Sequence, residues 1–158
     1  MSNLIGEFEC KIDAKGRFML PAGIKKQLPV EEQDKFVVNR GFENCLVLYP
    51  YSVWQTISDE VNRLNLFNKK NRDFARYFFR GATELTVDSV SRLLLPKPLM
   101  QYANLDKEMV MFAFANKIEI WAKDAYYALH VNEPDDFSSL AEEVMGKKDN
   151  KGSSNELS

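Results

Sequence analysis

Polar and apolar residues alternate along several short stretches of the chain. Between Glu7 and Asp13, the side chains of Phe8, Cys10 and Ile12 occupy every second position and are separated by charged residues. A period of two is typical of a strand that buries one face, so the pattern predicts a half-buried strand here.

The residues that follow predict a reversal of the chain. Gly16 permits a positive φ angle, so residues 14–16 are expected to form a tight turn. A second strand then begins at Arg17 and ends before Pro21. We therefore interpret residues 5–20 as a β-hairpin.

Further along, alternating stretches give way to apolar residues at helical spacing. The expected elements of this part are a short helix begun near Pro21, strands at 36–39 and 45–49, a helix at 52–65 with Ser52 as its N-cap, and a helix at 71–79.

Residues 6–21 reappear in register at residues 81–96, with an offset of 75 residues from Asp13 to Asp88. The identical pairs are Gly6 and Gly81, Glu9 and Glu84, Asp13 and Asp88, Arg17 and Arg92, Leu20 and Leu95, Pro21 and Pro96. A repeat at one fixed period reports the architecture of a protein before any single motif does.

The second copy predicts the same series of elements as the first. These are strands at 84–88, 92–95, 109–114 and 118–121, helices at 99–103 and 124–130, and a last helix from Asp135 or Asp136 to Gly146. The predicted fold is α+β with a mainly β core, made of two β-β-α-β-β-α half-repeats with peripheral helices. Pseudo-twofold packing of the halves into one barrel would bury the sheet faces and remove exposed edges.

The composition narrows the possible functions. No apolar run approaches the roughly 18 residues of a membrane span, and the N-terminus lacks the pattern of a signal peptide, so we expect a cytoplasmic protein with no membrane partner. Two distant cysteines and one histidine argue against a metal site, a disulfide framework and Ser-His or Cys-His catalysis. We expect no cofactor, no small-molecule substrate and no enzymatic activity. Asp13 and Asp88 sit at equivalent turns, which favours a structural role over acid-base catalysis.

Charge is unevenly distributed along the chain. The net charge is −2, but residues 68–80 sum to +4 and residues 133–149 sum to −4. The basic segment, with Lys69, Lys70, Arg72, Arg76 and Arg80, is interpreted as a solvated helix face for contacts with acidic neighbouring subunits, or alternatively as a direct DNA contact.

Four segments, taken together and in order, resemble the MraZ family. They are residues 6–21 with Asp13-Ala14-Lys15-Gly16-Arg17, residues 40–50 with Arg40-Gly41 and Tyr49-Pro50, residues 78–82, and residues 117–121. The resemblance covers about residues 5 to 131 and implies tandem SpoVT/AbrB-like halves in one double-split β-barrel. It further implies a ring-forming bacterial transcriptional regulator that binds direct repeats in double-stranded DNA, upstream of the division and cell-wall gene cluster. Such a protein would be associated with the nucleoid.

The resemblance also assigns roles to individual residues. Lys15 and Arg17 are expected to contact DNA, with Lys11 as a secondary candidate, although a solvated turn with Arg17 paired to Asp13 is the alternative. Arg92 is left open between DNA contact and a clasp with Asp88. Asp13, Gly16 and Asp88 are expected to support the turns.

The second copy departs from the family pattern at one turn. Ser91 replaces the usual glycine, and Val90 stands opposite Lys15. Because non-glycine residues resist positive φ, an altered turn and a weaker DNA contact are expected there.

The predicted segments are 5–80 and 81–131 for the two halves, 132–146 for a C-terminal helix and 147–158 for a disordered tail. The rival functions are a structural or protein-interaction ring, and an antitoxin-like DNA binder with a protein partner.

Overall fold

The central sheet of the protein has six antiparallel strands in the order β1-β7-β8-β4-β3-β5, and a separate two-stranded ribbon pairs β2 with β6. The computed structural model describes residues 3–130 and 133–146. The strands are β1 Gly6–Lys11, β2 Arg17–Met19, β3 Lys35–Arg40, β4 Leu46–Pro50, β5 Thr83–Thr86, β6 Arg92–Leu94, β7 Glu108–Phe114 and β8 Lys117–Ala122.

Helices connect these strands and continue toward the C-terminus. They are α1 Ala22–Lys25, η1 Val30–Glu32, α2 Tyr51–Asn62, α3 Lys69–Phe79, α4 Lys97–Tyr102, α5 Lys123–Leu129, α6 Glu133–Ala141 and the π-helical turn η2 Glu142–Gly146. The predicted α+β class and the repeated β-β-α-β-β-α order are therefore confirmed. Closure of the strands into one barrel stays a prediction, because the ladders define a sheet and a ribbon.

The chain divides into two units, Met1–Lys123 and Asp124–Ser158. The first unit holds both β layers and helices α1 to α4, and the second holds helices α5, α6 and η2. The predicted tail at 147–158 lies outside the described residues, as does the boundary at residues 131 and 132. No helix in the described ranges is both long and apolar enough to cross a bilayer.

The sequence repeat is also a symmetry of the strand order. Exchanging the halves replaces β1 by β5, β3 by β7 and β4 by β8, which leaves the order of the sheet unchanged apart from its direction. The ladders follow the same rule, since Phe18 lies opposite Leu93 in the ribbon and Val47 lies opposite Glu119 in the sheet. Two copies of one unit thus pair with each other rather than each folding separately.

The predicted hairpin at residues 5–20 is wrong for this reason. β1 forms its ladder with β7, and β2 forms its ladder with β6 of the other half. The turn between β1 and β2 does form, but the strands diverge after it. Alternation in a sequence shows which face of a strand is buried and not which strand is its partner.

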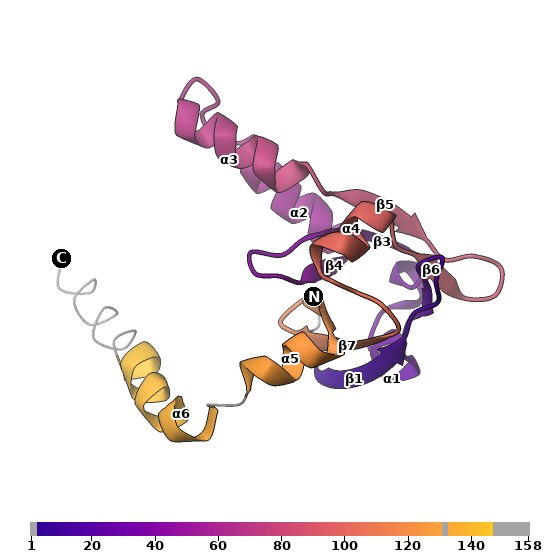
Figure 1. Cartoon of the computed structure of the whole chain (residues 1–158). Coiled ribbons are helices and arrows are strands. Elements are labelled where there is room, and N and C mark those ends of the chain that lie inside the picture. The colour runs from indigo at the N-terminus through magenta and orange to yellow at the C-terminus, as the bar shows by residue number, and fades with distance from the viewer. Residues whose placement is uncertain (1–2, 131–132, 147–158) are drawn as a thin grey trace. The chain divides into compact units, whose positions relative to one another are not determined.

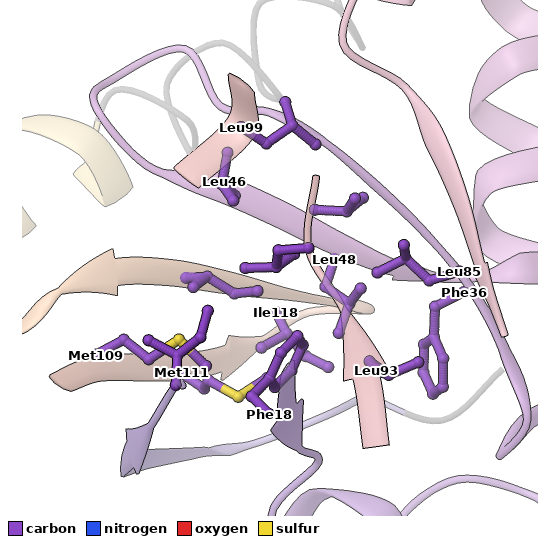
Figure 2. Packing of buried hydrophobic residues seen from close by; sticks show 14 of the residues in the cluster. Phe18, Phe36, Leu46, Leu48, Leu85, Leu93, Leu99, Met109, Met111 and Ile118 are labelled. Atoms are coloured by element: carbon purple, nitrogen blue, oxygen red, sulfur yellow. The ribbon is translucent and has the colours of Figure 1, made fainter. Parts of the chain in front are cut away.

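The core of the first unit lies between the sheet and the ribbon. Phe18 and Leu93 project from the ribbon, and Met109, Met111 and Ile118 project from the sheet, so that all five side chains meet in one buried cluster (Figure 2). Burial of each such side chain contributes about 1.5–3 kcal/mol to folding. The buried cluster therefore holds the short ribbon in place.

Helices α2 and α3 form a pair beside the sheet (Figure 1). The Trp54 ring of α2 stacks on Phe78 of α3 at a centroid distance of 5.6 Å. The predicted N-cap at Ser52 is wrong, because the helix begins at Tyr51 after Pro50 and the Ser52 hydroxyl donates to the Glu32 carboxylate. Proline suits the start of a helix because its backbone lacks the N–H that would have no partner there.

Candidate nucleic-acid interface

The turn after β1 is organised by the carboxylate of Asp13. Its Oδ1 accepts the backbone N–H groups of Lys15 at 3.0 Å and Arg17 at 2.9 Å, and its Oδ2 accepts the Arg17 Nε–H at 2.7 Å. The backbone N–H of Asp13 donates to the Arg17 carbonyl at 3.0 Å. One carboxylate therefore closes the turn and orients the arginine.

The turn in the second copy has the same hydrogen bonds. Asp88 Oδ1 accepts the backbone N–H groups of Val90 at 3.0 Å and Arg92 at 2.8 Å, and Oδ2 accepts Arg92 Nε–H at 3.0 Å. Ser91 adopts φ +66° and Gly16 adopts φ +93°. The expected alteration of this turn is therefore wrong, because the Asp88 bonds hold Ser91 in the left-handed region despite its side chain.

The two turns differ in what lies against them. Gly16 is buried, its carbonyl accepts the Leu95 N–H at 2.8 Å, and a Cβ at this position would stand 2.6 Å from the Leu95 carbonyl oxygen. Ser91 is exposed. Glycine is thus required at position 16 by both φ and space, whereas only φ opposes a side chain at position 91.

The ribbon of β2 and β6 presents both arginines on one face. Arg17 lies opposite Leu94 and Arg92 lies opposite Met19, whereas the inward pair is Phe18 and Leu93. Met19 and Leu94 are 59% and 53% exposed, although both are apolar. The outer face is therefore a four-residue patch, Arg17, Met19, Arg92 and Leu94, which we call the ribbon face.

Each arginine on the ribbon face is held by an aspartate through its Nε atom. Arg17 and Arg92 use Nε to bind Asp13 and Asp88, and in the described part of the chain their Nη groups have no hydrogen-bond acceptor. About one third of each side chain is exposed. The clasp is therefore present in both copies, and it leaves the Nη groups available to a further acceptor, while the DNA contact of Arg92 stays a prediction.

Lys11 borders the same surface, whereas Lys15 stands apart from it. A hollow of about 620 Å³ is lined by residues that include Lys11, Asp13, Arg17 and Arg92. Lys15 does not line this hollow and is exposed at the turn. The structure therefore brings Lys11, Arg17 and Arg92, three of the four predicted DNA-binding residues, to one hollow. The fourth, Lys15, lies at the adjacent turn. Gly16 and Asp88 lie within the turns themselves.

The hydrogen bonds of the turns also affect ionisation. The backbone N–H of Arg17 is the main cause that lowers the pKa of Asp13, and the backbone N–H of Arg92 does the same for the pKa of Asp88. Hydrogen bonds to a carboxylate favour its charged form. Both turns are therefore held by ionised aspartates at neutral pH.

The basic segment on α3 is partly neutralised within its own helix. Lys69 Nζ lies 2.8 Å and Arg76 Nη1 lies 3.6 Å from the Asp73 carboxylate. Arg72 instead donates to the carbonyls of Leu66 and Phe67, each at 2.9 Å. These contacts tie the helix to its preceding loop.

Sequence reasoning missed Met19 and Leu94 as parts of this surface. A signal was present in the alternation of a strand, because each lies next to a residue that the structure buries, Phe18 or Leu93. Neither polarity nor charge distinguishes an exposed methionine or leucine from a buried one.

Among the described residues, no cluster of His, Cys, Asp and Glu could hold a metal ion.

These features define a class of protein: a tandem-repeat α+β protein whose halves exchange strands and share one ribbon with clasped arginines. The family model described as "MraZ protein, putative antitoxin-like" matches the chain twice, at residues 4–77 and 78–147. The chain belongs to the MraZ family.

Individual relatives agree with this assignment along nearly the whole chain. A protein named "Transcriptional regulator MraZ" from Christiangramia forsetii is 49% identical over 150 residues, which is 94% of this chain and 97% of the relative. Proteins of the same name from Flavobacterium psychrophilum and Desulforamulus reducens are 45% and 38% identical over 147 and 141 residues. These matches cover 92% and 89% of this chain, and 94% and 96% of the respective relatives.

Proposed function

We propose that this protein is a transcriptional regulator that binds double-stranded DNA in a sequence-specific manner through the ribbon face and the adjacent turns. The names of its relatives support the regulatory role. The observation that carries the DNA contact is the pair of clasped arginines, Arg17 and Arg92, on one exposed two-stranded ribbon.

The two-stranded form and the chemistry of the ribbon suit the major groove of DNA. That groove admits a two-stranded β-ribbon, and guanidinium groups form paired hydrogen bonds to guanine O6 and N7 or to phosphate. Met19 and Leu94 can contact thymine methyl groups, and Lys11 and Lys15 can reach the flanking phosphates as point charges. The ribbon face would therefore contact bases while the lysines fix its position.

One ribbon offers few contacts, so a single subunit is expected to bind weakly. We propose that several copies assemble into a ring and bind direct repeats spaced about one helical turn, roughly 10 bp, so that successive ribbons face the same side of the duplex. Linked weak contacts then combine into a tight complex through avidity. The proposed targets are the repeats upstream of the protein's own operon, in the division and cell-wall gene cluster.

The test is a DNA titration of the Arg17→Ala variant over a range of salt concentrations. Loss of one phosphate contact per subunit should flatten the salt dependence by about 0.9 in log-log slope, and loss of a base contact should cost about 1–3 kcal/mol of discrimination. Arg63→Ala is the matched control, because Arg63 is an exposed arginine at the end of α2. Unchanged binding by Arg17→Ala, with its assembly state preserved, would refute the proposed contact and favour a protein-interaction role.

A further inference from the structure

A second exposed surface lies on α3, away from the ribbon face. The side chains of Arg40, Phe42, Phe74, Tyr77, Phe78 and Tyr102 line a hollow of about 340 Å³, which we call the aromatic groove. Phe42 is 91% exposed and Tyr77 is 67% exposed. Aromatic side chains grouped in this way in contact with solvent mark an interaction site.

The aromatic groove is built rigidly. Arg40 donates from Nη2 to the Tyr77 carbonyl at 2.7 Å, and the Tyr102 hydroxyl donates to the Gly41 carbonyl at 2.8 Å. Phe74 and Phe78 stack at a centroid distance of 5.7 Å. These contacts fix three walls of the groove, from β3, α3 and α4, before any partner arrives.

The charge around the aromatic groove is positive. Arg40 forms no ion pair within the described residues, and its Nε is buried without a hydrogen-bond partner there. Tyr77 also borders a neighbouring hollow lined by Asp73, Arg76 and Arg80. A partner for this surface should therefore combine apolar side chains with carboxylates.

The segment formed by α6 and η2, residues 133–146, has this combination. Phe137 and Leu140 lie three positions apart on α6, Val144 lies in the π-helical turn η2, and the three side chains are 63%, 58% and 55% exposed. The same segment contains five acidic residues and no lysine or arginine. Apolar anchors at positions i and i+3 are typical of a helix that binds in a groove.

We propose that the α6–η2 segment of one copy docks in the aromatic groove of a second copy. Phe137, Leu140 and Val144 would fill the groove, and Asp136 or Glu142 would lie near Arg40, Arg76 and Arg80. The proposal rests on the self-association part of the proposed function and is independent of the ribbon face. Because the two surfaces differ, the contact is head-to-tail, which generates a closed ring or an open chain of copies.

The first test is crosslinking between two singly substituted chains. Tyr77→Cys and Leu140→Cys are purified separately, mixed under mild oxidation and compared with Tyr77→Cys mixed with Val30→Cys, an exposed position in η1. Burial raises the pKa of Cys10 to about 11 and that of Cys45 to about 12, so the native thiols should react slowly. A disulfide-linked heterodimer formed only with Leu140→Cys is the expected result.

Two outcomes of this test would overturn the proposal. One is the absence of a heterodimer in the mixed sample while the chain assembles. The other is a disulfide that forms only within a single chain carrying both Tyr77→Cys and Leu140→Cys, since this would place the segment in its own groove.

The second test measures self-association without DNA by sedimentation at low and high salt. Leu140→Ser should weaken association by about tenfold or more, whereas the control Val30→Ser should not, because removal of a central apolar anchor costs more than loss of an isolated surface side chain. Arg80→Glu should also weaken association, and its combination with Glu142→Lys should restore part of the loss. Association of Leu140→Ser equal to that of the parent protein would contradict the proposal.

These measurements also separate the two proposals. DNA is absent from both tests, so their failure would leave DNA contact by the ribbon face intact. Conversely, Arg17→Ala should assemble normally even where it no longer binds DNA.

Discussion

A single side chain distinguishes the two turns of the repeat. The carboxylates of Asp13 and Asp88 form matching sets of hydrogen bonds, yet one turn has glycine in the left-handed position and the other has Ser91. The Asp88 bonds hold Ser91 at φ +66° although its Cβ disfavours that region. The second turn thus has the same hydrogen bonds as the first, but the backbone of Ser91 is strained.

Ser91→Gly should therefore stabilise the protein. Relief of the left-handed strain is worth about 1 kcal/mol, reduced by the greater flexibility of glycine in the unfolded chain. Urea unfolding monitored by circular dichroism should show a higher midpoint with an unchanged slope. The opposite change, Gly16→Ser, should destabilise by about 1–3 kcal/mol because a Cβ at that position also meets the Leu95 carbonyl. Equal effects of the two substitutions would contradict this account.

Acid should weaken both turns. The folded-state pKa values of Asp13 and Asp88 lie below the ordinary value of 3.8, so their contribution to stability is present above that pH and is lost as the pH falls through the folded pKa values. Unfolding midpoints measured between pH 6 and about pH 3 should fall less for Asp13→Asn than for the parent protein. A parallel decline in the two proteins would show that Asp13 does not contribute.

At the level of elements, the ribbon of β2 and β6 separates core side chains from exposed ones within the three residues of each strand. Phe18 is buried in the core, and its neighbour Met19 is exposed on the ribbon face. Adjacent residues on a strand point to opposite sides, so each can be changed without the other.

Phe18→Ala should destabilise the protein by about 3–5 kcal/mol, because it leaves a cavity in the buried cluster. Met19→Ala should change the free energy of unfolding by less than about 0.5 kcal/mol, since its side chain is exposed. It should nevertheless weaken DNA binding if the ribbon face enters the groove. Denaturant unfolding and DNA titration on the same two variants check both statements.

The sequence predicted the elements of the fold more fully than their partners. Periodicity and turn residues identified the strands and helices, because these depend on neighbouring residues along the chain. The exchange of strands did not follow, since the ladder of β1 with β7 joins residues about a hundred positions apart, for example Gly6 and Ala113. Local pattern carries no information on such a pairing.

The candidate site divides in a similar way. The pairing of Arg17 with Asp13 could be predicted from the turn motif, whereas a DNA contact by Arg17 was expected only from the resemblance to the MraZ family, and the repeat extended both interpretations to Arg92 and Asp88. That both arginines share one face depends on the ladder of β2 with β6, and so does the position of Met19 and Leu94 on the same face. The ladder must therefore be known before the two turn motifs can be assigned to one surface.

The whole first unit should unfold in a single transition. The two halves share one core and alternate within one sheet, so neither half has a separate set of contacts to lose. Trp54 reports on the first half and Trp121 on the second. In a Trp54→Phe background, the fluorescence signal comes from Trp121. Addition of Phe18→Ala should then lower the unfolding midpoint by the same amount whether unfolding is followed by Trp121 fluorescence or by circular dichroism. Two separate transitions would indicate independent halves.

The ladder of β1 with β7 also determines when the protein can fold during its synthesis. β1 leaves the ribosome well before its partner β7, whose last residue is Phe114. Until that residue emerges, the nascent chain exposes an unpaired strand edge and the apolar side chains of an unfinished core, which are features that promote aggregation. Pairing over such a separation also slows folding, because a long loop must close first. The duplication that unites two halves in one polypeptide thus delays the pairing of β1 until the strand β7 of the other half has been made.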